Sequence, residues 1–186
     1  MAGFTSSVAR VDAGDLGASW RKGCPVGPAD LRAVTLAYRG FDGARHVGVL
    51  VVHEDVVGSV VAAFRRLYDL GFPIRSMRPV SAYGASDDAS MAADNTSAFN
   101  CRRAVAAGPP SWSRHAYGKA IDVNPVENPY LFQGDVLPPA GAAYRSRAKA
   151  RPGLFRRGDA AVRAFTDQGF RWGAAFSSPD YQHFDR

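Results

Sequence analysis

The sequence predicts an α+β protein built on a small antiparallel sheet. Apolar residues alternate along 34–38 with the two-residue period of strands, and a turn at 40–43 leads to a second expected strand near 46–52. Between 56 and 68 the apolar residues recur at helical spacing instead. Strands and helices do not alternate along the chain as they do in parallel sheets, so we expect an antiparallel sheet flanked by helices.

Two helices are expected, over 55–70 and 159–168. In the first, Asp55 can cap the start, and Gly71 suits the left-handed position that follows a helix end. We expect this longer helix to cover one face of the sheet.

The remaining segments are shorter. Strands are expected over 73–77, 97–102 and 120–123, and residues 84–96 have the composition of a polar loop. Residues 125–158 are rich in proline, which predicts a long surface excursion.

The length of 186 residues suits one domain with a hydrophobic core. Residues 1–30 are rich in Gly, Ala and Ser and predict an extended N-terminal arm, followed by a single domain over 31–186. No apolar run approaches the ~20 residues that span a bilayer, so no transmembrane segment is expected. The first residues also lack the pattern of a signal peptide.

The chain is basic, with 23 Lys and Arg against 17 Asp and Glu. A basic surface attracts polyanions such as nucleic acid, anionic membranes or an acidic cell-wall polymer. The densest basic groups, at 145–151 and 156–157, have no interleaved aromatic residues for base stacking. Nucleic-acid binding is therefore not expected.

The two cysteines, Cys24 and Cys101, form no C-x-x-C pair, so a cysteine zinc site is not expected. An even count permits one disulfide, which would stabilise the fold by roughly 4–5 kcal/mol because it closes a long loop. Two buried free thiols fit the sequence equally well.

Histidine and aspartate residues suggest a metal site. Asp122 lies in an expected strand, seven residues after His115, and its neighbours Ile121 and Val123 face the opposite side. Burying such a carboxylate is costly unless it is paired or bound to a metal. Zinc binds imidazole and carboxylate groups, and a catalytic zinc has three protein ligands and one open position.

His183 is the natural third ligand. Asp180 lies three residues before it and could act as the general base of a metallopeptidase. His46 and His53 lack such neighbours, so we assign them structural or surface roles.

The chain combines two motifs, S-x-H-x-x-G-x-A-x-D over 113–122 and D-x-x-H over 180–183. Together they resemble the M15 or VanY-like metallopeptidases, which include D-alanyl-D-alanine carboxypeptidases and L-alanyl-D-glutamate endopeptidases. The segments 95–102, 120–125 and 172–173 are similar to one branch of this group, so the resemblance covers residues ~20–186.

The resemblance implies a fold shared with the hedgehog signalling domain, in which a small antiparallel sheet carries the zinc. It implies His115, Asp122 and His183 as ligands of Zn²⁺ and Asp180 as the base. It also implies an arginine that holds the substrate carbonyl oxygen, for which Arg102 is the match. The adjacent Arg103 competes for this role, although strand alternation would point it away.

The activity implied is zinc-dependent hydrolysis of peptidoglycan stem peptides, by a D,D-carboxypeptidase or an L-Ala–D-Glu-type endopeptidase. The alternative is a catalytically inactive zinc-containing binding module of the same fold. The resemblance further implies a secreted or cell-envelope protein, where a Cys24–Cys101 disulfide would persist, and we expect a monomer. Ser113 is expected to support the ligands. Four aromatic residues are candidates to line the cleft: Trp112, Tyr117, Trp172 and Tyr181.

Overall fold

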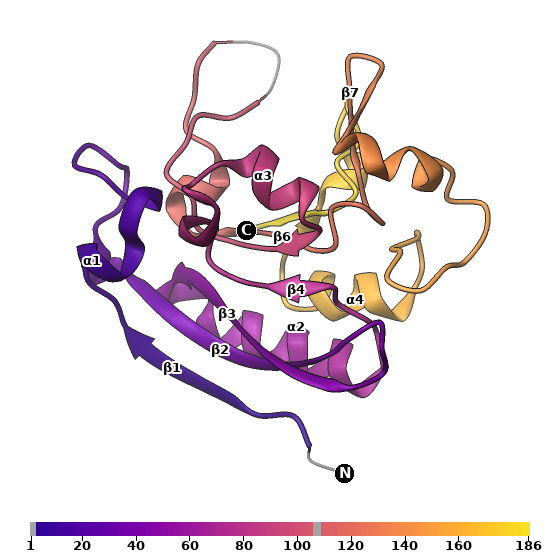
Figure 1. Ribbon diagram of the computed structural model, residues 1–186, viewed down its shortest axis with the longest axis horizontal. Helices are drawn as coiled ribbons and strands as arrows, with labels where there is room; N and C mark the ends of the chain where they lie inside the picture. The colour runs from indigo at the N-terminus through magenta and orange to yellow at the C-terminus, as the bar shows by residue number, and fades with distance from the viewer. Residues whose placement is uncertain (1–2, 106–108) are drawn as a thin grey trace.

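The computed structural model describes residues 3–105 and 109–186 and confirms a mixed α+β molecule with small antiparallel sheets. The longest strands form a sheet of order β1-β2-β3, in which each pair is antiparallel (Figure 1). These strands are β1 (Ser6–Arg10), β2 (Leu31–Arg39) and β3 (Arg45–His53). The expected hairpin is thus confirmed.

Within the described residues, four α-helices and several 3-10 turns accompany the strands. The helices are α1 (Ala13–Leu16), α2 (Val57–Asp69), α3 (Asp87–Ala92) and α4 (Ala160–Thr166). The 3-10 turns are η1 (Gly17–Ser19), η2 (Pro28–Asp30), η3 (Glu54–Val56), η4 (Val80–Tyr83), η5 (Arg114–Tyr117), η6 (Pro139–Tyr144) and η7 (Gly173–Ala175). Both expected helices are confirmed, as α2 and α4.

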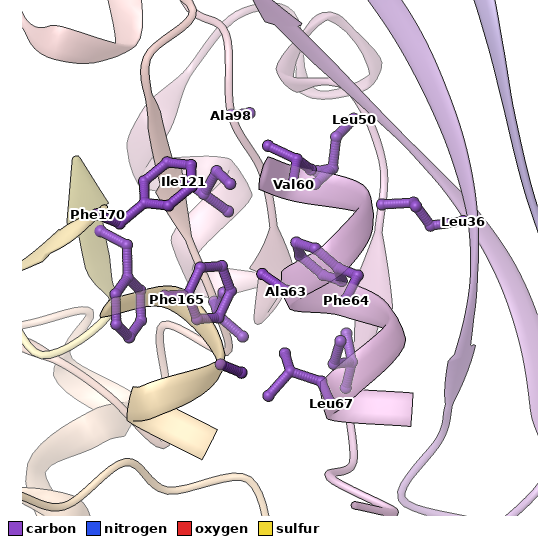
Figure 2. Packing of buried hydrophobic residues seen from close by; sticks show 14 of the residues in the cluster. Leu36, Leu50, Val60, Ala63, Phe64, Leu67, Ala98, Ile121, Phe165 and Phe170 are labelled. Carbon is purple, nitrogen blue, oxygen red and sulfur yellow. The ribbon is translucent and has the colours of Figure 1, made fainter. Parts of the chain in front are cut away.

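The main core lies between the first sheet, α2 and α4. The buried side of α2 packs against β2 and α4, with Phe64 edge-on to Phe165 of α4 (Figure 2). Phe165 in turn stacks on Phe184, at a centroid distance of 4.1 Å. Phe184 is fully buried. Because neighbours in a strand point to opposite faces, the core contact of Phe184 directs His183 and Asp185 away from the core.

A second antiparallel sheet lies beyond this core, with the order β6-β10-β9. It consists of β6 (Ala120–Asp122), β10 (His183–Asp185) and β9 (Arg171–Trp172). The register places His183 directly opposite Asp122. This pairing brings together residues that are 61 positions apart in the chain.

The remaining strands are short. β4 (Ser76–Met77) pairs in parallel with β5 (Asn95–Thr96), and β7 (Tyr130–Phe132) forms a hairpin with β8 (Asp135–Leu137). The strand expected over 73–77 is therefore reduced to β4. The strand expected over 97–102 is wrong, because β5 ends before it and only an isolated bridge from Ser97 to Asp122 lies in that range. Few residues of either segment find a hydrogen-bonding partner strand.

Two local expectations are wrong. Residues 84–96 are not only a loop, because they contain α3, whose first turn is capped by the hydroxyl of Ser86. Asp55 does not cap α2, since the chain enters this helix through η3. The ring of His53 accepts a hydrogen bond at that start, and the carboxylate of Asp55 binds Lys119 instead.

The long excursion at 125–158 is not entirely on the surface. Phe155 joins the main core, and the buried amide of Asn128 holds it through a 2.8 Å hydrogen bond from the Phe155 backbone. Within residues 1–30, the strand β1 runs along β2, and Cys24 forms a disulfide with Cys101. The disulfide hypothesis is thereby confirmed. In the described part of the chain, none of the helices has the length and apolar character needed to cross a bilayer.

Candidate metal centre

Three short elements carry the candidate ligands. His115 lies in η5, whose entry is fixed by the Ser113 hydroxyl accepting from the His115 backbone N–H at 3.2 Å. The turn ends at Gly118, which has a φ of +65°, and a Cβ there would lie 2.6 Å from the backbone nitrogen of His53. Glycine is therefore required at this close approach. The chain then enters β6, which supplies Asp122.

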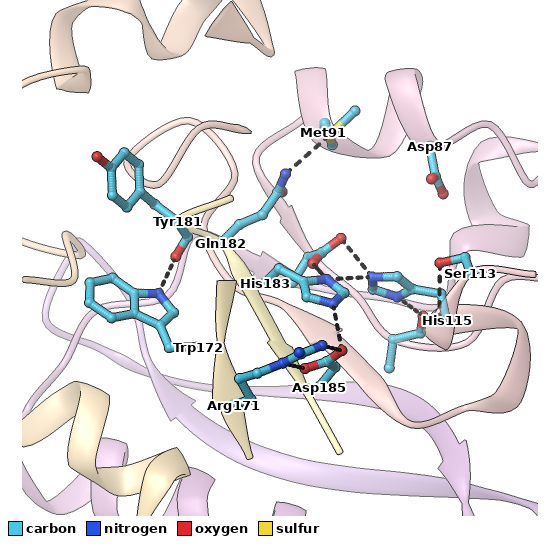
Figure 3. A network of polar contacts seen from close by, with 12 residues as sticks. Asp87, Met91, Ser113, His115, Arg171, Trp172, Tyr181, Gln182, His183 and Asp185 are labelled. Atoms are coloured by element: carbon cyan, nitrogen blue, oxygen red, sulfur yellow. Dashed lines mark hydrogen bonds and ion pairs between the residues drawn. The ribbon is translucent and has the colours of Figure 1, made fainter. Parts of the chain in front are cut away.

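The three expected ligands converge. The Nε2 of His115 lies 3.1 Å from Asp122 Oδ2, and the Nδ1 of His183 lies 3.0 Å from Asp122 Oδ1. The two ring nitrogens are 3.2 Å apart, and Figure 3 shows the two rings adjacent. Bonds of zinc length at tetrahedral angles would separate ligand atoms by about 3.3 Å. The donor set therefore fits a small divalent ion.

Each imidazole is held by its other nitrogen. The Nδ1 of His115 donates to the carbonyl oxygen of Ala98 at 2.6 Å, which leaves Nε2 free to bind an ion. The Nε2 of His183 lies 3.8 Å from Asp185 Oδ2. Asp185 is itself clamped by Arg171 through two hydrogen bonds of 3.0 and 2.9 Å.

The charged side chains of the cluster shift one another's pKa values. Burial raises the pKa of Asp122, but the adjacent charge and hydrogen bonds of His115 and His183 outweigh it, and the pKa is lowered. Burial likewise lowers the pKa of His183, but hydrogen bonds and charge from Asp122 and Asp185 raise it to about 10. The carboxylate is thus ionised, as a metal ligand must be.

Asp180 lies beside the three ligands. Its Oδ1 is buried and has no hydrogen-bond partner within the described chain. Burial and the charge of Asp122 raise the pKa of Asp180 to about 6, against the opposing influence of the two histidines and Gln182. A buried carboxylate with an unused oxygen and a pKa near neutrality is suited to accept a proton.

Residues 107–186 match a family model described as D-alanyl-D-alanine carboxypeptidase. The match includes every element of the His–Asp–His cluster. Over these residues the chain is similar to the M15 peptidases. No curated protein and no solved structure matches the chain significantly.

This similarity suggests a peptidase that acts on peptidoglycan-like substrates. M15 peptidases are generally metal-dependent, and the buried cluster of His115, Asp122 and His183 could hold the ion.

The two arginines that compete for the carbonyl-binding role of an M15 peptidase point in different directions. Arg102 lines a cleft of about 360 Å³ that also contains the three candidate ligands and Asp180. Burial lowers the pKa of Arg102, while the charges of Asp122 and Asp180 raise it. Arg103 instead lies over the ring of Trp112, 3.9 Å from its centroid.

The walls of the cleft differ from the expectation. Trp112 lines it as expected, but the other aromatic residues that line it are Tyr130 and Phe176. Trp172 instead stacks on Phe184, and its indole N–H donates to the backbone carbonyl of Tyr181. Tyr117 and Tyr181 also do not line the cleft, and the guanidinium of Arg147 lies over the ring of Tyr181.

Sequence reasoning did not find Asp87, Asp185 or Tyr130. Asp87 forms an ion pair with Arg102, and the carboxylate of Asp185 lies 3.8 Å from the Nε2 of His183. The hydroxyl of Tyr130 donates to the carbonyl oxygen of Val105 at 3.1 Å. Only Asp185 had a sequence signal, because a residue two positions after a strand ligand faces the same side.

Proposed function

We propose that this chain is a zinc metallopeptidase that hydrolyses peptide bonds in the stem peptides of bacterial peptidoglycan. The observation that carries the proposal is the convergence of two imidazoles and two carboxylates, one with an unused oxygen, in a cleft that also holds Arg102. Both D,D-carboxypeptidase and L-Ala–D-Glu-type endopeptidase activities are compatible with such a site.

The residues have distinct roles in this proposal. His115, Asp122 and His183 would hold Zn²⁺, which when bound polarises a carbonyl and acidifies water. Asp180 would accept a proton from the attacking water and pass it to the departing amine. Arg102 would donate hydrogen bonds to the oxygen that gains negative charge. An inactive binding module would need neither Asp180 nor Arg102 in the cleft.

The proposal also covers the location of the protein, its oligomeric state and its domain organisation. The Cys24–Cys101 disulfide supports a secreted or cell-envelope protein, because such bonds persist in oxidising compartments. We propose a monomer in which an N-terminal arm over 1–30 precedes the domain at 31–186. That domain would share the fold of the D-alanyl-D-alanine metallopeptidases and the hedgehog domain.

Substitutions can distinguish the proposed metal ligands from the proposed general base. We expect His183→Ala to lose the metal, while Asp180→Ala keeps it and loses ~10²–10⁴ in rate, the usual share of a general base. His46→Ala is the control, because its ring faces the exposed Asp42 and should leave both properties unchanged.

Metal content is measured by elemental analysis, and products of purified peptidoglycan are identified by mass spectrometry. Unchanged zinc in His183→Ala would contradict the ligand set. Full activity in Asp180→Ala would show that Asp180 is not the general base.

A further inference from the structure

The guanidinium of Arg102 is not a free positive charge. Its Nε forms an ion pair with the carboxylate of Asp87, at the first position of α3. The other oxygen of Asp87 accepts a 2.7 Å hydrogen bond from the side-chain amide of Asn100, which is buried. Asp87 is therefore fixed beside Arg102 by two separate contacts.

The other arginines that line the described part of the cleft are also engaged. Arg171 is paired with Asp185 through two hydrogen bonds. Arg114 donates to the backbone carbonyl oxygen of Arg186. A substrate that enters the cleft thus finds guanidinium groups that already have acceptors.

The charges around Arg102 balance once a divalent ion is present. The two positive charges of the ion and the one of Arg102 are matched by the carboxylates of Asp122, Asp180 and Asp87. Without Asp87, the same group would carry one net positive charge. That excess would attract a substrate carboxylate.

We infer that Asp87 is a specificity-determining residue that directs this cleft to internal peptide bonds, rather than to the bond beside a free C-terminal carboxylate. This inference rests on the proposed function and narrows it to endopeptidase activity. Arg102 keeps N–H groups that can bind an uncharged carbonyl oxygen. A carboxylate at the same place would be repelled by Asp87, and no excess positive charge would offset its loss of hydration.

The test compares wild type with Asp87→Asn, both zinc-loaded and full-length. The substrates are a stem pentapeptide ending in D-Ala–D-Ala with a free carboxylate and the same peptide as a C-terminal amide. We expect wild type to cut the amide at least as fast as the acid, or to cut only internal bonds. Asp87→Asn should raise the acid-to-amide ratio by about tenfold, because a unit charge a few ångströms away acts on that scale. A strong preference of wild type for the terminal bond of the acid would overturn the inference.

Asp69→Asn is the matched control, since it removes the same charge from an exposed position at the end of α2, outside the residues that line the cleft. It should leave the ratio unchanged, and an equal rise in both variants would also overturn the inference.

Binding gives a readout that needs no turnover. Calorimetric titration with N-acetyl-D-alanine and with its amide measures the two affinities. In Asp87→Asn alone, the affinity for the acid should rise by about tenfold relative to the affinity for the amide. If no variant hydrolyses any peptide, the proposed function fails, while this titration still decides the role of Asp87. An unchanged relative affinity would refute that role even in an active enzyme.

Discussion

His183 turns one ring nitrogen toward Asp122 and the other toward Asp185, at 3.0 and 3.8 Å. Figure 3 shows Arg171 and His183 both next to Asp185, so this carboxylate contacts a guanidinium and an imidazole. A carboxylate in this position orients the ring and raises its basicity as a metal ligand.

Asp185→Ala should therefore weaken metal binding by about 10–100-fold, the usual cost of losing such a partner. Competition with a chromophoric chelator at fixed pH measures the affinity. Asp42→Ala is the control, because it removes a similar partner from the remote His46. Equal affinities in the two variants would show that Asp185 has no such role.

The carboxyl group of Glu127, away from the cluster, also has an unusual environment. Burial, followed by the hydrogen bond and charge of Asp94, raises the pKa of Glu127 from 4.5 to about 8, although Arg75 opposes the rise. The group is therefore protonated in the fold at pH values where the unfolded chain has already lost the proton. Its contribution to stability is complete below the unfolded pKa and is lost as the pH rises toward about 8.

Glu127→Gln should remove this pH dependence. We expect the stability of the variant relative to wild type to increase between about pH 5 and pH 8, by at most about 1.4 kcal/mol per pH unit. Urea unfolding of both proteins over this range measures the difference. A constant difference would show that Glu127 ionises normally in the fold.

At the scale of elements, η7 and the turn before β10 position the reactive segment. The backbone N–H of Asp180 donates to the carbonyl oxygen of Gly173 at 3.0 Å. A Cβ on Gly173 would lie 2.5 Å from the backbone oxygen of Asp180 and 3.2 Å from the Cβ of His183. Since a backbone atom cannot rotate away, any side chain at this position must displace the turn.

Gly173→Ala should consequently lower activity by about 10²-fold, the scale of a 1 Å misplacement in an active site, and should also weaken metal binding. Gly58→Ala is the matched control, because a Cβ at that position in α2 meets nothing within 4 Å. It should keep activity and stabilise the helix by about 0.5–1 kcal/mol. Wild-type rates in Gly173→Ala would show that the turn accommodates the extra group.

The length of an element and the regularity of its apolar pattern decided whether the sequence could predict it. The β2–β3 hairpin and α2 were predictable because each is long, the apolar residues of β2 alternate, and those of α2 keep the helical period. α3 was not, because it has six residues in a polar run and depends on the Ser86 cap and the acidic first turn. Strands of two residues, such as β4 and β5, form only where a distant partner is present.

At the scale of the whole molecule, long-range contacts limited prediction most. The residues of the His–Asp–His cluster could be named from two motifs, but the Asp87–Arg102 pair could not, because it depends on how α3 folds over the segment after Cys101. The choice between Arg102 and Arg103 likewise depended on backbone geometry that no local pattern gives.

The disulfide links distant parts of the chain covalently. It joins Cys24 to Cys101, 77 positions apart, and a hydrogen bond from Arg21 to the Cys101 carbonyl oxygen reinforces the attachment. Replacing both cysteines by serine should cost roughly 4–5 kcal/mol of unfolding free energy on the chain-entropy model. Urea unfolding measures the loss, with reduced wild-type protein as the comparison. A loss below about 1 kcal/mol would show that the bridge adds little constraint.

The pairing of β10 with β6 has a consequence for the order of assembly. His183 reaches Asp122 only after a 61-residue stretch of chain has folded back on itself. A folding intermediate that lacks this closure presents only two donors, His115 and Asp122, and so competes weakly for an ion. Metal loading would thereby be reserved for molecules that have completed their tertiary structure, and a bound ion would hold β10 against β6.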